Sequence, residues 1–340
     1  MKKIISILAA VLLLAGALSG CQEAKKPDDA SQKKLQIVAT IFPEYDWVRN
    51  ILGTETDAAD LTLLLSSGVD LHSYQPTAAD IMKISTCDLF IYVGGESDAW
   101  VSDALKEAVN PDMVVINLLE ELGSAVREEE IVEGMEEDHD HEEGEEHEEG
   151  EEHEHGHGEE PEFDEHVWLS LRHASALSAS IEKALASLDP ANADAYAANL
   201  KSYQEKLSAL DKRYQETVSA ASFDTLLFGD RFPFRYLTED YGLQYYAAFP
   251  GCSAETEASF ETVVFLSEKL EELGLPAVMT LEGSDQKIAE TIISNTSSKD
   301  QKILTLDSLQ SVTAKQASDG VSYLSVMEEN LAVLKTALGQ

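Results

Sequence analysis

Seven of the chain's nine histidines lie between residues 136 and 168. From Asp138 to Glu160, histidine alternates with acidic residues and glycine, and no apolar residue is available for burial. We therefore expect a mobile loop, within an acidic segment of about residues 128–161. Its imidazoles offer weak, interchangeable sites for zinc and other late transition metals, whereas a solvated acidic linker is the alternative interpretation. The six histidines are His139, His141, His147, His153, His155 and His157.

Three further histidines lie in sequence that can fold. His166 follows the loop in DEHVW, His72 lies in GVDLHSYQP, and His173 begins a segment of helical periodicity, where we interpret it as structural. Neutral imidazole is a common ligand of zinc and of other borderline divalent cations. His72 and His166 are therefore candidates for one fixed metal site, although His72 could equally be a surface residue.

The elements that must position these residues are short apolar runs separated by segments of helical periodicity. Strands that are apolar throughout are typical of parallel sheets covered by helices on both faces. The sequence predicts an α/β protein of two lobes, each with a four-stranded, mainly parallel sheet and flanking helices. The predicted strands are Leu35–Ile41, Leu61–Leu65, Leu89–Val93, Met113–Leu118, Thr225–Phe228, Leu243–Ala248, Ala277–Leu281 and Lys302–Leu306.

Between the two groups of strands the pattern changes to two helices. We predict Ala174–Leu188 and Ala191–Ser219, the second carrying an apolar stripe at three- and four-residue spacing that indicates core packing. Its length is roughly 40 Å at 1.5 Å per residue, enough to join two lobes. We therefore assign residues 35–172 to an N-terminal lobe, 173–221 to linking helices and 222–340 to a C-terminal lobe.

Ligands of open parallel sheets bind beyond the carboxyl ends of the strands. Applied to the predicted strands, this rule brings two histidines and several carboxylates to one edge of the molecule. Such a set suits zinc or manganese. The strand ends place His72, Glu96, His166, Asp230, Glu282 and Asp307 at this edge.

Enzymatic alternatives have weaker support in the sequence. A metal-dependent hydrolase would need a placed general base, for which Glu96 or Glu282 could serve. HExxH, GxSxG, Walker and dinucleotide-binding patterns do not occur in the sequence. We therefore expect a binding protein that is not an enzyme.

The overall composition also limits the partners. The chain has 340 residues, 44% of them hydrophobic, and a formal net charge of −40. That charge is concentrated, because 22 of the 64 acidic residues lie between Glu128 and Glu165. No basic patch would suit a phosphate backbone, so we expect no nucleic-acid partner.

The N-terminus indicates export. Two lysines precede an apolar run from Ile4 to Leu18, which is short for a membrane span and typical of a signal peptide over residues 1–20. Leu18-Ser19-Gly20-Cys21 resembles a bacterial lipobox, which predicts lipid modification of Cys21. Residues 21–34 are polar and predict a flexible tether to the cell membrane. The remaining cysteines, Cys87 and Cys252, are expected to be separate thiols.

Six longer motifs occur along the chain: GVDLHSYQPTAADI, CDLFIYVGGESDAW, DEHVWLS, YLTEDYGL, LTLDSL and GVSYLSVMEENLAVLKTAL. Together they resemble one known family, the metal-specific solute-binding lipoproteins of bacterial ABC importers, in particular its zinc-binding branch with a histidine-rich loop. The resemblance implies two βα lobes joined by one long helix, with a single divalent ion bound between them.

The resemblance also implies ligands. His72 and His166 match ligands of the N-terminal lobe, and Asp307 matches one of the C-terminal lobe. The remaining expected position falls on Arg231, whose fixed positive charge opposes a cation. We predict that the neighbouring Asp230 takes this role, with Glu282, Glu255 or a water as competitors.

The function implied is that of a monomeric, lipid-anchored extracytoplasmic receptor that binds Zn2+ and delivers it to an ABC permease. Two histidines with two carboxylates would also suit Mn2+, so a manganese receptor is the first alternative. The histidine-rich loop favours zinc. A surface adhesin on the same fold is a further alternative.

Overall fold

The computed structural model of the chain describes residues 34–135, 162–253 and 257–340. Several predicted features lie outside these described residues: Cys21, Glu255 and the loop histidines His139, His141, His147, His153, His155 and His157. In the described part, no helix is long and apolar enough to cross a membrane.

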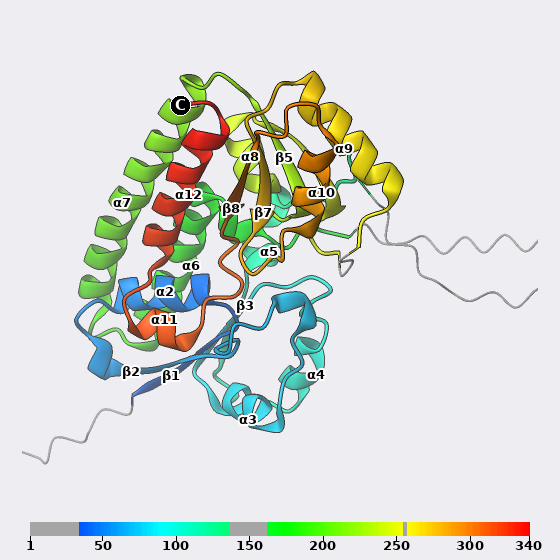
Figure 1. Cartoon of the computed structure of the whole chain (residues 1–340). Helices are drawn as coiled ribbons and strands as arrows, with labels where there is room; N and C mark the ends of the chain where they lie inside the picture. Colours follow the sequence, from blue (N-terminus) through cyan, green and yellow to red (C-terminus); the bar gives the residue numbers. More distant parts are fainter. Residues whose placement is uncertain (1–33, 136–161, 254–256) are drawn as a thin grey trace, which may run out of the picture. The chain divides into compact units, whose positions relative to one another are not determined.

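The strands form two four-stranded sheets in which every neighbouring pair is parallel, as predicted (Figure 1). The N-terminal sheet has the order β2-β1-β3-β4 and the C-terminal sheet the order β6-β5-β7-β8, so both lobes follow the same pattern. The strands are β1 Leu35–Ala39, β2 Ala59–Leu63, β3 Leu89–Tyr92, β4 Val114–Asn117, β5 Thr225–Phe232, β6 Gln244–Pro250, β7 Ala277–Leu281 and β8 Lys302–Leu306.

Helices connect and cover these strands. Short polar caps fix several of their starts; Ser170, for example, accepts a hydrogen bond from the backbone N–H of His173 in the first turn of α6. The helices are α2 Phe42–Leu52, α3 Ala78–Thr86, α4 Val101–Lys106, α5 Leu118–Leu122, α6 Leu171–Leu188, α7 Ala193–Ser219, α8 Arg235–Tyr241, α9 Phe260–Glu272, α10 Lys287–Asn295, α11 Ala314–Ser318 and α12 Tyr323–Ala337, with short 3-10 turns at Thr56–Ala58, Leu71–Ser73, Gly123–Ala125 and Val167–Leu169.

The long helix α7 joins the two lobes. It packs against α6 and α2 on the N-terminal side and against α8 and α12 on the C-terminal side (Figure 1). Its buried stripe contains Tyr196, Tyr203, Leu207, Leu210 and Tyr214, which confirms that the predicted apolar stripe is core. The helix therefore restrains how far one lobe can move against the other.

Trp168 connects the lobes close to His166. Its indole Nε1–H donates to the Ser308 carbonyl at 2.8 Å, and its own carbonyl accepts from the Tyr323 hydroxyl at 2.7 Å. All three residues are buried. The described residues from Leu35 onward form a single compact unit.

Strand β5 is longer than predicted. We expected it to end at Phe228, but it continues to Phe232 through a register shift between Phe228 and Arg231. The continuation was missed because Gly229-Asp230-Arg231 interrupts the apolar pattern, while pairing with Phe249 restores the ladder at Arg231. Asp230 and Arg231 therefore lie within a strand rather than in the loop after it.

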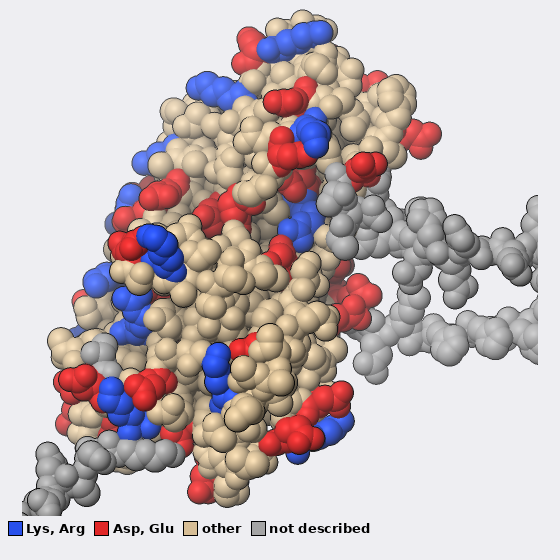
Figure 2. All heavy atoms as spheres, turned by 60° about the horizontal axis from the view of Figure 1, so that its bottom comes forward, with Lys and Arg blue, Asp and Glu red and all other residues tan. Residues whose placement is uncertain are grey.

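The described surface carries charges of both signs. Figure 2 shows lysine and arginine side chains interspersed with aspartate and glutamate over the face in view. Many of them pair locally, such as Arg213 with Glu328 at 2.7 Å. Pairs of this exposed kind contribute little to stability.

Two tyrosines of α7 give a matched test of the packing between α7 and α12. The buried Tyr214 hydroxyl donates to the Met327 carbonyl at 2.6 Å, whereas the buried Tyr203 hydroxyl has no hydrogen-bond partner among the described residues. We predict that Tyr214→Phe lowers the free energy of unfolding by about 1 kcal/mol and that Tyr203→Phe leaves it unchanged or raises it. Urea denaturation checks this, and a larger loss in Tyr203→Phe would contradict the packing described.

Candidate metal centre

His166 is held rigidly by the residue two positions before it. Asp164 Oδ1 accepts the His166 backbone N–H at 2.9 Å and lies 3.1 Å from the ring Nδ1. A carboxylate at Nδ1 fixes the ring orientation and favours the tautomer whose Nε2 carries a lone pair. His166 is fully buried, so its free nitrogen is presented to the site without competing water.

His72 is positioned in a similar way. Asp70 Oδ1 accepts the His72 backbone N–H at 3.0 Å, and the ring Nδ1 lies 2.7 Å from Ser97 Oγ and 3.7 Å from Glu165 Oε2. Glu165 in turn accepts the Ser97 backbone N–H at 2.9 Å. With Nδ1 occupied, the Nε2 of His72 is left to face the site.

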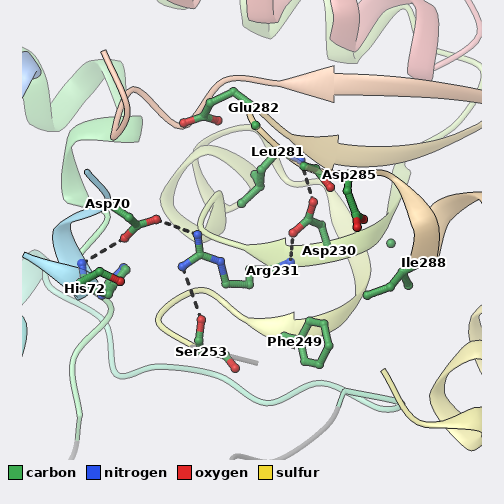
Figure 3. Close-up of a pocket in the computed structure, with 14 residues that line it drawn as sticks. Asp70, His72, Asp230, Arg231, Phe249, Ser253, Leu281, Glu282, Asp285 and Ile288 are labelled. Atoms are coloured by element: carbon green, nitrogen blue, oxygen red, sulfur yellow. Dashed lines mark hydrogen bonds and ion pairs between the residues drawn. The ribbon is translucent and has the colours of Figure 1, made fainter. Parts of the chain in front are cut away.

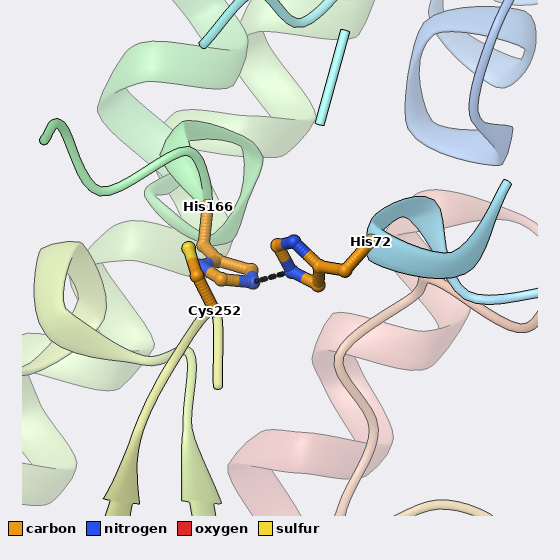
Figure 4. A group of neighbouring side chains, drawn as sticks. All are labelled: His72, His166 and Cys252. Carbon is orange, nitrogen blue, oxygen red and sulfur yellow. Dashed lines mark hydrogen bonds between the residues drawn. The ribbon is translucent and has the colours of Figure 1, made fainter. Parts of the chain in front are cut away.

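The two Nε2 atoms point at each other, 3.2 Å apart (Figure 4). Two nitrogens bound to one tetrahedral zinc at about 2.0–2.1 Å would be separated by about 3.3 Å. Two unprotonated lone pairs at this distance repel each other, and a shared proton or a cation between them removes the repulsion. The pair therefore has the geometry of two metal ligands.

Burial keeps His72 neutral. It lowers the pKa of His72 to about 3, with a further lowering from the neighbouring His166 and from Arg231, while Asp70 opposes these effects. A neutral imidazole is the form that binds a metal, so His72 is ready to bind over the whole physiological pH range.

Cys252 lies close to the two histidines. One possible ligand atom from each of His72, His166 and Cys252 lies within 4.8 Å of the other two, and Figure 4 shows the thiol beside the His166 ring. Both Cys252 and the buried Cys87 are free thiols, as predicted. Burial raises the pKa of the Cys252 thiol, and the carboxylates of Glu129, Glu165 and Asp164 raise it further.

Arg231, the residue at the expected ligand position, is engaged by the opposite lobe. Its guanidinium Nη2 lies 2.7 Å from Asp70 Oδ2, and Nη1 donates to the Ser253 carbonyl at 3.4 Å (Figure 3). Burial alone would raise the pKa of Asp70. The positive charge of Arg231 and its hydrogen bond to Asp70 outweigh this effect, so the pKa of Asp70 is lowered. The ion pair bridges the two lobes beside His72.

His72 lies between two cavities. The larger, of about 430 Å3, is lined by Asp70, His72, Asp230, Arg231 and Glu282 among others (Figure 3). The smaller, of about 230 Å3, is lined by His72, Glu165 and Cys252 together with Glu96, Ser97, Glu129, Glu162 and Phe163. Both cavities give solvent a path to His72.

The predicted carboxylate ligands lie apart from this group. Asp230 accepts backbone N–H groups at both oxygens, from Arg231 at 2.9 Å and from Leu281 at 3.1 Å. Asp307 accepts the Leu309 N–H at 2.7 Å. Among the described residues, neither joins the ligand atoms that lie within 4.8 Å of one another. Their roles as ligands stay predictions.

Glu282 lies next to Asp307 and is held by hydrogen bonds from two serines. Its oxygens accept from the Ser308 backbone N–H at 2.7 Å, the Ser308 hydroxyl at 2.6 Å and the Ser311 hydroxyl at 3.2 Å. Burial and the neighbouring Asp307 raise the pKa of Glu282 to about 7. Glu96, another predicted metal-binding or supporting carboxylate, is exposed on the wall of the smaller cavity.

Sequence reasoning identified both histidines but missed the residues that support them. The signal was present as a repeated Asp-x-His pattern, Asp70-Leu71-His72 and Asp164-Glu165-His166. In both cases the aspartate accepts the backbone N–H of the histidine. His173, interpreted as structural, lies in the first turn of α6 with its ring packed against Tyr236 at 5.1 Å between ring centroids.

Comparison with known proteins places the chain in a family. Residues 37–337 match the family model described as zinc-uptake complex component A, periplasmic. The chain belongs to this family. It is 32% identical over 345 residues to the zinc-binding lipoprotein AdcA of Streptococcus pneumoniae serotype 4, covering 100% of this chain and 62% of that relative. The chain thus spans less than two thirds of AdcA.

Another family member matches over nearly its whole length. The high-affinity zinc uptake system protein ZnuA of Bacillus subtilis is 32% identical over 332 residues, which cover 98% of this chain and 96% of that protein. Among solved structures, Zn(II)-bound AdcA of Streptococcus pneumoniae aligns with a TM-score of 0.68 and 28% identity, covering 90% of this chain and 58% of AdcA. The predicted two-lobed fold is thereby confirmed.

The lowered pKa of His72 gives a test with a definite sign. The folded chain takes up the proton only near pH 3, whereas an unfolded histidine does so near 6.5. The stabilisation that results is fully present above pH 6.5 and is lost as the pH falls toward 3. We predict that, in metal-free protein, the free energy of unfolding falls less between about pH 7 and pH 5 in His72→Gln than in the wild type.

Urea denaturation with a chelator present, at both pH values, measures this difference. Other buried groups titrate in the same range, but they are common to both proteins and cancel in the comparison. An equal or larger loss in His72→Gln would show that His72 is not held neutral by burial.

Proposed function

We propose that the chain is an extracytoplasmic receptor that binds Zn2+ between its two lobes and delivers it to the permease of an ABC importer. The observation that carries this proposal is the convergence of the His72 and His166 Nε2 atoms at 3.2 Å. Membership of the zinc-uptake family supports the delivery step. The zinc-binding names of AdcA and ZnuA support the choice of metal.

The donor atoms favour zinc over manganese. Manganese prefers carboxylate, carbonyl and water oxygens, whereas imidazole nitrogen suits zinc. Both positioned donors here are imidazoles, and the third possible ligand grouped with them among the described residues is a thiol. A manganese receptor of the same family is the second candidate, and it requires Asp230 and Asp307 to move to the histidine pair.

A binding role accounts for the site better than catalysis does. A zinc hydrolase needs a carboxylate placed to act as a general base on metal-bound water. Glu282 is held by Ser308 and Ser311, and Glu96 lies on the exposed cavity wall. We therefore propose that the chain is not an enzyme.

Release of the ion must fit the restraint imposed by α7. Because this helix packs on both lobes, we propose small tilts or local rearrangements rather than wide opening. The Asp70–Arg231 ion pair, at 2.7 Å, is one contact between the lobes that such a tilt would strain. Competition from the permease would then draw the ion from the histidine pair.

We further propose that the mature protein is a monomer tethered to the cell membrane through a lipid on Cys21. The lipobox sequence and the description of AdcA as a lipoprotein support the anchor. The histidine-rich segment would collect zinc for the fixed site, because histidines in an acidic tract bind late transition metals weakly and reversibly.

Metal titration tests the central part of this proposal. We predict one tight Zn2+ site in the chain from Gln22 onward, and a loss of affinity of more than about 100-fold in His166→Ala, since losing a direct ligand exceeds the 10–100-fold cost of losing an outer partner. The matched control is His173→Ala, which should keep wild-type affinity. Equal affinities in wild type and His166→Ala would refute the site.

Deleting residues 138–160 separates the fixed site from the loop. We predict that the tight site survives with its preference for Zn2+ over Mn2+, while the weaker binding sites disappear. Isothermal titration of both proteins with each metal distinguishes the outcomes. Complete loss of tight binding would make the loop the receptor, and a preference for Mn2+ would select the second candidate.

A further inference from the structure

Arg231, which occupies the expected ligand position, lies next to strand β6. β5 and β6 run side by side, with Arg231 opposite Phe249 and Phe232 opposite Pro250. The chain leaves β6 at Pro250 and passes directly into Gly251 and Cys252. Cys252 therefore lies beside Arg231, the position where the family resemblance places a ligand.

Local packing brings this turn against the histidine pair. A Cβ built on Gly251 would lie 3.1 Å from His166 Cε1 and 2.9 Å from the Phe232 carbonyl, so a larger residue there would push the turn away. The Cys252 backbone N–H donates to Glu129 Oε1 at 3.0 Å, and the Ser253 carbonyl accepts from Arg231. The turn is thus fixed on both sides of the thiol.

The distances suit a shared ion. In a tetrahedral site with zinc–nitrogen bonds of about 2.05 Å and a zinc–sulfur bond of about 2.3 Å, nitrogen and sulfur are about 3.6 Å apart. The ligand atoms of His72, His166 and Cys252 already lie within 4.8 Å of one another. Binding of a shared ion therefore requires the sulfur and the nitrogens to approach one another by at most about 1.2 Å.

The charges around the thiol favour a cation. Glu165 is buried and lines the smaller cavity together with His72 and Cys252. Its Oε2 has no hydrogen-bond partner among the described residues. A divalent ion with one thiolate carries a net charge of +1, which the nearby carboxylates of Glu165, Glu129 and Asp164 stabilise. The positive charge of Arg231 is already offset by Asp70.

We propose that Cys252 is a third ligand of the metal, binding as a thiolate together with His72 and His166, and that it restricts the cargo to ions with affinity for sulfur. This inference rests on the proposed function and names the ligand that sets its specificity. On binding, the S–H bond breaks, the proton passes to solvent, and the sulfur lone pair forms the metal–sulfur bond.

Three protein ligands suit a transported ion better than four. Closed four-ligand zinc sites are typical of structural zinc, whereas three ligands leave a position open to water or to an incoming group. That open position gives the permease a point of attack. A soft thiolate favours Zn2+ over the harder Mn2+.

The carboxylates predicted for this role are occupied elsewhere. Asp230 is bound by the backbone N–H groups of Arg231 and Leu281. In Figure 3, Asp230 lies on the far side of Arg231 from His72. Recruiting Asp230 would break both hydrogen bonds and move it past a guanidinium, whereas the Cys252 thiol already lies beside the His166 ring.

Cobalt substitution of the full chain tests the proposal, because a thiolate ligand gives Co2+ an intense charge-transfer absorption in the near ultraviolet that nitrogen and oxygen ligands do not. With one equivalent of Co2+, we predict this band in the wild type and its removal by Zn2+. Cys252→Ser should lack the band. Cys87→Ala and Cys21→Ser, which change the other two cysteines, should keep it.

Zinc affinity is measured on the same proteins by competition with a chromophoric chelator. Removing an outer partner of a metal ligand lowers metal affinity by about 10–100-fold, and we predict that Cys252→Ser lowers Zn2+ affinity by at least as much. Its preference for Zn2+ over Mn2+ should also decrease. Circular dichroism confirms that each variant is folded. Iodoacetamide labelling gives a second readout, with Zn2+ protecting Cys252 in the wild type.

The outcomes separate this inference from the function on which it rests. If tight Zn2+ binding depends on His166 but Cys252→Ser keeps the wild-type affinity, or if the cobalt band is absent from the wild type or persists in Cys252→Ser, the thiolate ligand is refuted and the receptor function stands. If the wild type has no tight Zn2+ site that depends on His166, the proposed function itself fails.

Discussion

The candidate site is organised around two imidazole nitrogens that face each other at 3.2 Å. Without a proton or cation between them, this arrangement is repulsive, and it persists only because other contacts impose it. Asp164 holds one ring, and Ser97 with Glu165 holds the other. Burial keeps His72 uncharged, so the contact is prepared for a cation rather than for protonation in the physiological range.

The fold supplies these contacts through its strand ends and long helices. His72 follows β2 and His166 precedes α6, so the N-terminal lobe alone presents both rings. The C-terminal lobe closes the site with Cys252 and Arg231, and Trp168 and Tyr323 tie that lobe to the segment carrying His166. Since α7 packs against both lobes, we propose that small local movements rather than wide opening expose or cover the ion.

Much of this architecture could be predicted because it follows from local pattern. Apolar runs gave the eight strands, and the strand-end rule gave His72 and His166. The remainder depends on contacts between distant residues. No local pattern reveals that Asp70 pairs with Arg231, 161 positions away, or that β5 continues to Phe232 through a bulge. Cys252 was predicted as a structural thiol because its approach to His166 depends on the pairing of β5 with β6.

The position of the bound ion is the most direct test of this account. Crystals of the chain with one equivalent of zinc, measured at the zinc absorption edge, locate the metal by its anomalous scattering. The account predicts a single strong peak about 2.0–2.1 Å from both His72 Nε2 and His166 Nε2. A peak held by Asp307 and Glu282, with the two histidines still in direct contact, would contradict it.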